Sequence, residues 1–105
     1  MERTEQTTEQ VALELLKTKR KLAVFLGIGH NGGNEVKPKP ITDFVQKLDP
    51  TWHRNQMRVR NYIHRDANCL LFMNLVTWDY KRKVTSFTKK GKDVYEVIQN
   101  KLLNK

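Results

Sequence analysis

Apolar residues recur at helical spacing in the first quarter of the chain. Val11, Leu15 and Leu22 fall on one side of a helical projection, and Thr7 and Thr8 precede them. Acidic residues are frequent at the start of this stretch and basic residues at its end, as the helix dipole favours. We therefore predict one helix over residues 6–25.

Glycine and proline then interrupt the pattern. Gly27, Gly29, Gly32 and Gly33 are followed by Pro38 and Pro40. The stretch satisfies the Gly-x-Gly-x-x-Gly phosphate-binding pattern, but a dinucleotide site requires a helix to open at the third glycine, and none is predicted here. We expect residues 27–40 to form a loop or linker, without a nucleotide or any other cofactor.

Two short helices are predicted next. Ile41, Phe44, Val45 and Leu48 lie at helical spacing. Asp49-Pro50 ends this helix and supplies an N-cap and a first-turn proline for the next one. The second helix is predicted over residues 50–65, and its apolar face comprises Trp52, Val59, Tyr62 and Ile63.

A β-hairpin and a closing helix complete the predicted order of elements. Residues 70–78 and 84–88 are rich in β-branched and aromatic side chains, and the charged residues 79–83 separate them. Thr88 is the expected N-cap of a last helix in which Val94, Val97, Ile98 and Leu102 repeat. The predicted fold class is α+β, mostly α, with three or four helices and a two-stranded hairpin.

Composition separates the two halves of the chain by charge. The 105 residues carry a net charge of +9; residues 1–50 have eight basic and seven acidic side chains, whereas residues 51–105 have twelve and four. A chain of this size forms one domain, and the second half is the part that attracts a polyanion. No run is long and apolar enough to span a bilayer, and the start of the chain is unlike a signal peptide, so we expect no membrane partner and a cytoplasmic protein.

The predicted helix over residues 50–65 carries the strongest candidate site. Its outer stripe comprises Arg54, Arg58, Asn61 and Arg65, and an adjacent stripe comprises Gln56, Arg60 and His64. Arg, Asn and Gln make paired hydrogen bonds to base edges, and a helix fits the major groove. The alternative is a solvated basic face on a structural helix; against it, no acidic residue occurs from Thr51 to Arg65, whereas an ordinary surface helix intersperses both signs. The hairpin tip adds Lys81, Arg82 and Lys83, which are suited to phosphates.

The order of elements over residues 41–104 resembles the winged helix-turn-helix family. The segment Thr85-Ser-Phe-Thr-Lys-Lys-Gly-Lys-Asp-Val-Tyr is similar to the passage from the second wing strand into the C-terminal helix of MarR- and PadR-type regulators, with Thr88 as cap and Gly91 three positions later. The resemblance implies duplex DNA binding, transcriptional regulation and a homodimer. The chain is shorter than a typical MarR-type subunit, and the Gly-rich insertion is not part of that pattern.

The remaining predictions concern the domain ranges, the dimerisation residues and the origin of the protein. The helix over residues 1–26 is a possible dimerisation element, and residues 41–105 are the expected winged-helix domain. The dimerisation candidates are Val11, Leu15, Leu16, Leu22, Ile98 and Leu102, although packing within one chain is the alternative. Gly29-His-Asn-Gly-Gly is similar to strings in small phage and bacterial proteins, which implies a phage or mobile-element product.

Two other functions are compatible with the same sequence features. One is a phage-type inhibitor that uses the same scaffold and a basic face to bind an acidic host protein. Another is an RNA-binding accessory protein. The sequence shows no catalytic constellation, so we expect no enzyme activity. His53 and His64 are too far apart along a helix to share a metal ion, and Cys69 is expected to be a buried thiol.

Overall fold

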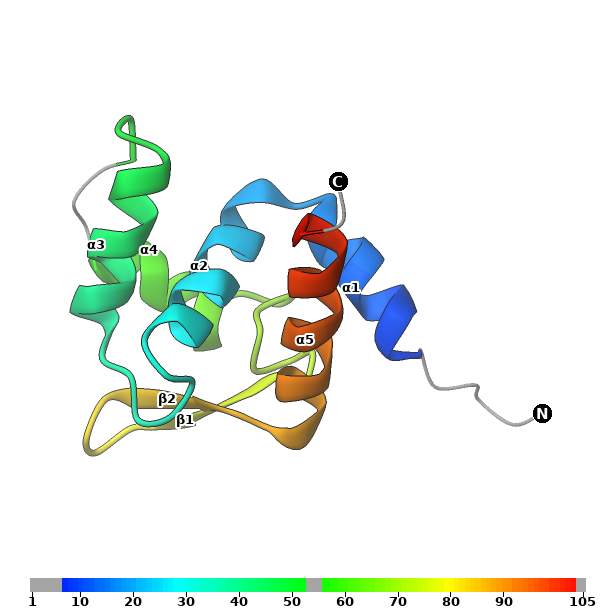
Figure 1. The fold of residues 1–105 in the computed structure, drawn as a ribbon. Coiled ribbons are helices and arrows are strands. Elements are labelled where there is room, and N and C mark those ends of the chain that lie inside the picture. Colours follow the sequence, from blue (N-terminus) through cyan, green and yellow to red (C-terminus); the bar gives the residue numbers. More distant parts are fainter. Residues whose placement is uncertain (1–6, 53–55, 104–105) are drawn as a thin grey trace.

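The computed structural model describes residues 7–52 and 56–103, and the fold is α+β and mostly helical (Figure 1). The elements run in the order α1 (Thr8–Leu16), α2 (Lys19–His30), α3 (Pro38–Leu48), α4 (Gln56–Arg60), the π-helical turn η1 (Asn61–Arg65), β1 (Val76–Asp79), β2 (Val84–Phe87) and α5 (Lys89–Leu103). The two strands form one antiparallel hairpin that lies across one end of the helices. This arrangement confirms the predicted fold class at the level of secondary structure.

The amino-terminal part forms two helices where the sequence predicted one. Thr7, one of the two threonines that precede the helical pattern, forms a reciprocal capping box with Gln10 at the start of α1. The helix ends at Leu16, and the Thr18 hydroxyl donates a hydrogen bond to the Leu15 carbonyl, 3.1 Å away. A β-branched residue that bonds its own backbone in this way competes with the helical ladder. The bend allows α1 to pack on α5 while α2 packs on α3.

The predicted loop over residues 27–40 is shorter than expected and is packed. Gly27 and Gly29 belong to the last turns of α2, and α3 already begins at Pro38, where proline is favourable in the first helical turn. Val36 forms an isolated antiparallel bridge with Thr85 of β2. The connection therefore adds a short segment beside the hairpin and is not a free linker.

The second predicted helix starts later than the sequence suggested. Pro50 and Thr51 lie in a turn, residues 53–55 lie outside the described part, and α4 starts at Gln56. Beyond Arg60 the chain continues as a π-helical turn, which the Asp66 amide ends by donating to the Asn61 carbonyl.

The apolar run that was predicted as a long strand is mostly a turn. The amides of Leu70 and Leu71 donate hydrogen bonds to the carbonyls of Tyr62 and Ile63, at 2.8 and 2.9 Å. These carbonyls lie at the end of a helical segment and need partners from outside it. Residues 70–75 therefore cap η1, and β1 begins only at Val76.

The hairpin and the last helix agree with the predictions. Val76 pairs with Phe87 and Asp79 with Val84, so the tip lies at residues 80–83. The Gly91 amide donates to the Thr88 hydroxyl at 3.0 Å, which confirms the cap. A side chain at Gly91 would meet the Leu75 carbonyl oxygen at 2.0 Å, so the start of α5 and the chain before β1 touch through backbone atoms.

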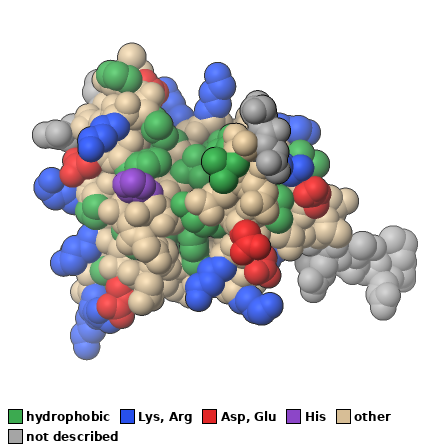
Figure 2. Space-filling view, viewed as in Figure 1, with side chains coloured by type: hydrophobic (Ala, Val, Ile, Leu, Met, Phe, Trp, Pro, Cys, Tyr) green, Lys and Arg blue, Asp and Glu red, His purple; other side chains and the backbone are tan. Residues whose placement is uncertain are grey.

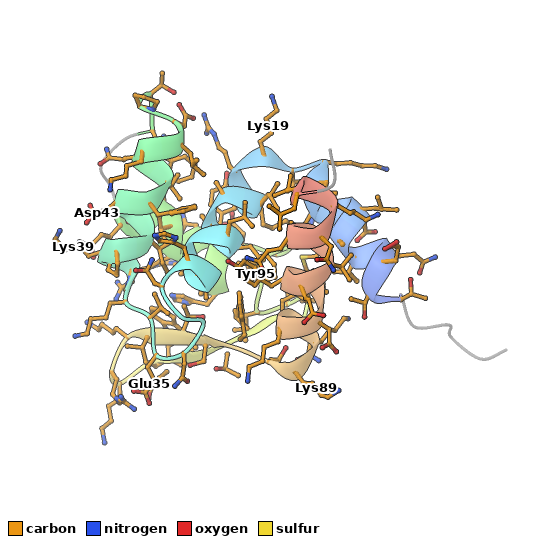
Figure 3. The ribbon with its side chains drawn as sticks, viewed as in Figure 1. Lys19, Glu35, Lys39, Asp43, Lys89 and Tyr95 are labelled. Carbon is orange, nitrogen blue, oxygen red and sulfur yellow. The ribbon has the colours of Figure 1, made fainter. Side chains whose placement is uncertain are left out.

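One hydrophobic core connects these elements. Phe25 lies at its centre, with Phe87 and Tyr95 at ring-centroid distances of 5.0 and 6.0 Å. Figure 3 shows Tyr95 directed from α5 towards α2. Among the described residues no helix has the length and apolar character that crossing a bilayer requires.

The predicted dimerisation residues are largely used within the chain. Val11, Leu15 and Ile98 are buried because α1 packs against α5, and Leu16 and Leu22 are half-buried. Of the six candidates only Leu102 is exposed, at 44%. The alternative of packing within one chain is therefore the one that the structure shows.

Candidate nucleic-acid interface

The turn before α4 is held by side-chain hydrogen bonds. The Asp49 carboxylate accepts from the amide and the hydroxyl of Thr51, at 3.0 and 2.5 Å, and these bonds lower the pKa of Asp49 below its ordinary value. Gln46 donates to the Trp52 carbonyl at 3.0 Å. Trp52 is buried against Tyr62, as predicted for a core residue. These bonds hold the turn that follows α3.

The outer face of α4 and η1 presents polar and basic side chains. We define the outer face as Arg58, Asn61 and Arg65. Gln56, Arg58 and Arg65 are exposed and Asn61 is half-buried. An Arg65 Nη1 group lies 3.3 Å from the Met57 sulfur, a weak acceptor that leaves most of the guanidinium donors available. Arg54, which was predicted to belong to this face, lies outside the described residues.

Arg60 and His64 turn away from the outer face and towards the hairpin. The His64 ring stacks on Trp78 with centroids 4.1 Å apart and planes at 15°, and its centroid lies 5.6 Å from that of Tyr80. The Arg60 guanidinium carbon lies 5.6 Å from the centre of the Trp78 ring. Of the predicted stripe of Gln56, Arg60 and His64, only Gln56 is exposed, because Trp78 contacts the other two.

Burial in this contact changes the protonation of His64. Its Nε2 atom and the Nε atom of Arg60 are buried without a hydrogen-bond partner. Desolvation lowers the pKa of His64 below its ordinary value, and the positive charges of Arg60 and Arg65 lower it further. The imidazole is neutral at neutral pH. It fixes the hairpin against η1 and does not offer a positive charge to a ligand.

The hairpin tip divides its basic residues between internal and external contacts. The Asp79 carboxylate accepts from the amides of Lys81 and Arg82, at 2.9 and 3.0 Å, and closes the turn. Arg82 forms a two-point ion pair with Glu35, at 2.6 and 3.0 Å, which lowers the pKa of Glu35. Lys81 and Lys83 are exposed and form no ion pair with a described residue. They remain as the cations of the tip available to a ligand.

Sequence reasoning missed the aromatic part of the site. Trp78 lies at the contact between the hairpin and η1, and Tyr80 is 69% exposed at the tip beside Lys81. The alternation of β1 indicates which residues face the helices, but it does not identify the residue on the opposing helix. Glu35 was missed because 47 residues separate it from Arg82 along the chain.

Metal ligands and the single cysteine are the other side chains of chemical interest. No group of three or more His, Cys, Asp or Glu residues among them is placed to hold a metal ion. Cys69 is buried, as predicted, and its sulfur accepts a hydrogen bond from the Phe72 amide.

The other side of the molecule differs in character. Figure 2 shows apolar side chains over α2 and its border with α5, while Lys and Arg side chains lie mainly around the rim.

The chain matches no protein-family model, no curated protein and no solved structure.

Proposed function

We propose that this protein binds duplex DNA with the outer face of α4 in the major groove, as a small winged-helix transcriptional regulator. The proposal is supported above all by one observation: a helical face that carries Arg58, Asn61 and Arg65 and no acidic residue lies beside a hairpin with a basic tip. Arg and Asn side chains read base edges by paired hydrogen bonds, and cations at the hairpin tip neutralise phosphates.

The hairpin contact gives this face a defined shape. Because His64 and Trp78 are stacked, the tip and the outer face of α4 are held at a fixed spacing. A preformed pair of contact surfaces loses less conformational entropy on binding than two independent ones. Tyr80, exposed at the tip, supplies a ring that can pack on a sugar or base next to the phosphates that Lys81 and Lys83 contact.

The first experiment is a salt titration of DNA binding. Fluorescence anisotropy with a labelled mixed-sequence duplex would compare the wild type, an Arg58→Ala/Arg65→Ala variant and a control, Lys89→Ala/Lys92→Ala, with the same change in charge on exposed residues of α5. We expect the arginine variant to bind about tenfold or more weakly and the control about two- to threefold, because only direct phosphate or base contacts release counterions efficiently.

Three results would contradict the proposal. Equal losses in the two variants would mean that net charge, and not the outer face of α4, governs binding. Tighter binding of RNA or single-stranded DNA than of duplex would favour the accessory-protein alternative. Absence of DNA binding at low salt, together with capture of an acidic protein, would favour the inhibitor alternative.

A further inference from the structure

A second basic surface lies where α1 meets α2. We call it the amino-terminal cluster: Lys17, Lys19, Arg20 and Lys21. Lys17, Lys19 and Arg20 are exposed and Lys21 is half-buried. None of the four forms an ion pair with a described residue, since the described ion pairs engage Lys39, Arg82, Lys89 and Lys101. Figure 3 shows Lys19 projecting away from the body of the molecule.

Contacts place this cluster beside η1. The Arg20 guanidinium lies 5.4 Å from the centre of the Trp52 ring, just before α4. The Lys21 ammonium donates to the Asn68 carbonyl at 2.8 Å, just after η1. A surface hollow of about 450 Å³ lies between the cluster and η1. Arg20 and Lys21 line it on one side, and Tyr62 and Asp66 line it on the other.

The cluster and the hairpin lie on opposite sides of the outer face of α4. Around the helix axis, Arg60 and His64 point to the hairpin, whereas Tyr62 points to the hollow beside the cluster. Arg58, Asn61 and Arg65 lie between these two borders. Figure 1 agrees: the start of α2 lies at the top, the hairpin at the bottom, and α4 at a height between them.

Two members of the cluster have structural contacts, since Arg20 lies against the Trp52 ring and Lys21 donates to the Asn68 carbonyl. Lys17 and Lys19 form no ion pair with a described residue. Three cations stand in the first turn of α2, where the helix dipole is positive and acidic residues are favoured. Thr18 does not cap this helix with its side chain. Cations at the start of a helix destabilise the folded chain slightly unless an external anion compensates their charge. Local conflicts of this kind are typical of binding surfaces.

We propose that the amino-terminal cluster contacts backbone phosphates of the same duplex, on the side of the groove opposite to the hairpin. This inference rests on the proposed function and extends it. The duplex is then held by cations on both borders of the reading face, Lys81 and Lys83 at one side and Lys17, Lys19 and Arg20 at the other. The bound sequence is longer than α4 and the hairpin alone would cover.

The test removes two exposed cations that form no ion pair with a described residue. A Lys17→Gln/Lys19→Gln variant would be titrated with a duplex of about three helical turns beside Lys89→Gln/Lys92→Gln, which loses the same charge on α5. We expect binding about tenfold weaker than wild type at about 0.1 M salt and a salt slope less steep by about two, as two lost phosphate contacts require. The melting temperature should stay about equal, because Lys19 opposes the dipole at the start of α2 whereas Lys17, the C-cap of α1, favours the dipole at the end of α1.

The outcomes separate this inference from the proposed function. If the Lys17→Gln/Lys19→Gln variant matches the α5 control while Arg58→Ala/Arg65→Ala binds weakly, the cluster is not a contact surface and the role of α4 stands. If the wild type fails to bind DNA, both proposals are wrong. A lowered melting temperature with proportionate loss of binding would show a structural role for the lysines and would also overturn the inference.

Discussion

His64 shows how a residue with the right chemistry for one role is given another by its neighbours. In a helical projection it belongs to a polar stripe, and nothing in its local sequence distinguishes it from a DNA-contacting side chain. Trp78 stacks on its ring and removes water from it. The same contact takes Arg60 from the outer face. The result is a rigid junction between hairpin and helix in place of two further contacts to a ligand.

The lowered pKa of His64 predicts a specific dependence of stability on pH. As pH falls through about 6.5, the ordinary value, the unfolded chain gains a proton that the folded chain resists, so stability is present above this pH and is lost below it. Melting temperatures measured from about pH 8 to pH 5 should therefore fall less steeply in a His64→Phe variant, which keeps a ring against Trp78 but cannot be protonated. His30→Gln, which removes an exposed histidine, is the control and should keep the wild-type decline. Parallel curves for wild type and His64→Phe would contradict the assignment.

Residue spacing placed exposed side chains on the helix but could not place their neighbours. Arg58, Asn61 and Arg65 were placed on one stripe by intervals of three and four residues, and the structure shows Arg58 and Arg65 exposed there. The periodicity of one helix indicates which side is apolar. It does not show where a distant strand covers the polar side, which is why Trp78 and the fate of Arg60 were missed.

At the scale of elements, local signals with a capping mechanism were reliable. Thr88 caps the last helix as predicted, because capping depends only on residues within one turn. Errors arose where backbone hydrogen bonds join distant segments. Residues 70–75, predicted as part of a strand, cap η1 because the carbonyls of Tyr62 and Ile63 require hydrogen-bond donors. The predicted helix over residues 6–25 is divided at Thr18 because its two halves pack on different helices.

The loop between α2 and α3 moderates the charge of the hairpin tip. Glu35 holds Arg82 by two charge-assisted hydrogen bonds, although both side chains are exposed. A Glu35→Gln variant releases this arginine and adds one unit of positive charge beside the tip. We expect it to bind duplex DNA about two- to tenfold more tightly at about 0.1 M salt, with a salt slope steeper by about one.

A matched variant tests whether position or net charge causes this change. Glu96→Gln makes the same change in charge at an exposed site on α5, and it should alter affinity by less than Glu35→Gln. Equal gains in both variants, measured by the same anisotropy titration, would show that Arg82 is not restrained by Glu35 in solution.

For the molecule as a whole, the packing of α1 on α5 decides how the amino-terminal helix is used. The sequence left open whether Val11 and Leu15 face a second copy or the same chain, because periodicity identifies an apolar side without its partner. In the structure Leu15 is fully buried in the single chain. The first helix is therefore part of the core of the single chain.

Leu15→Ala distinguishes core packing from dimerisation. We expect it to lower the free energy of unfolding by about 2–4 kcal/mol, as for other buried leucines, without changing the mass in solution. Leu13→Ala, on the same helix but 46% exposed, should cost about 0.5 kcal/mol or less. Urea denaturation and sedimentation equilibrium would measure the two quantities. A change from dimer to monomer in the Leu15 variant would show that the buried side of α1 serves a second copy.

The bridge between Val36 and Thr85 has a consequence for any attempt to dissect the protein. Thr85 exchanges two backbone hydrogen bonds with Val36, and the Phe87 amide donates to the Gly33 carbonyl, so residues 33–36 cover the outer edge of β2. A fragment that begins at residue 41 would retain α4 and the hairpin but leave this edge open. An uncovered strand edge recruits strands from other molecules. Such a fragment would tend to self-associate. In the intact chain, residues 33–36 occupy this strand edge and so prevent it from pairing with another molecule.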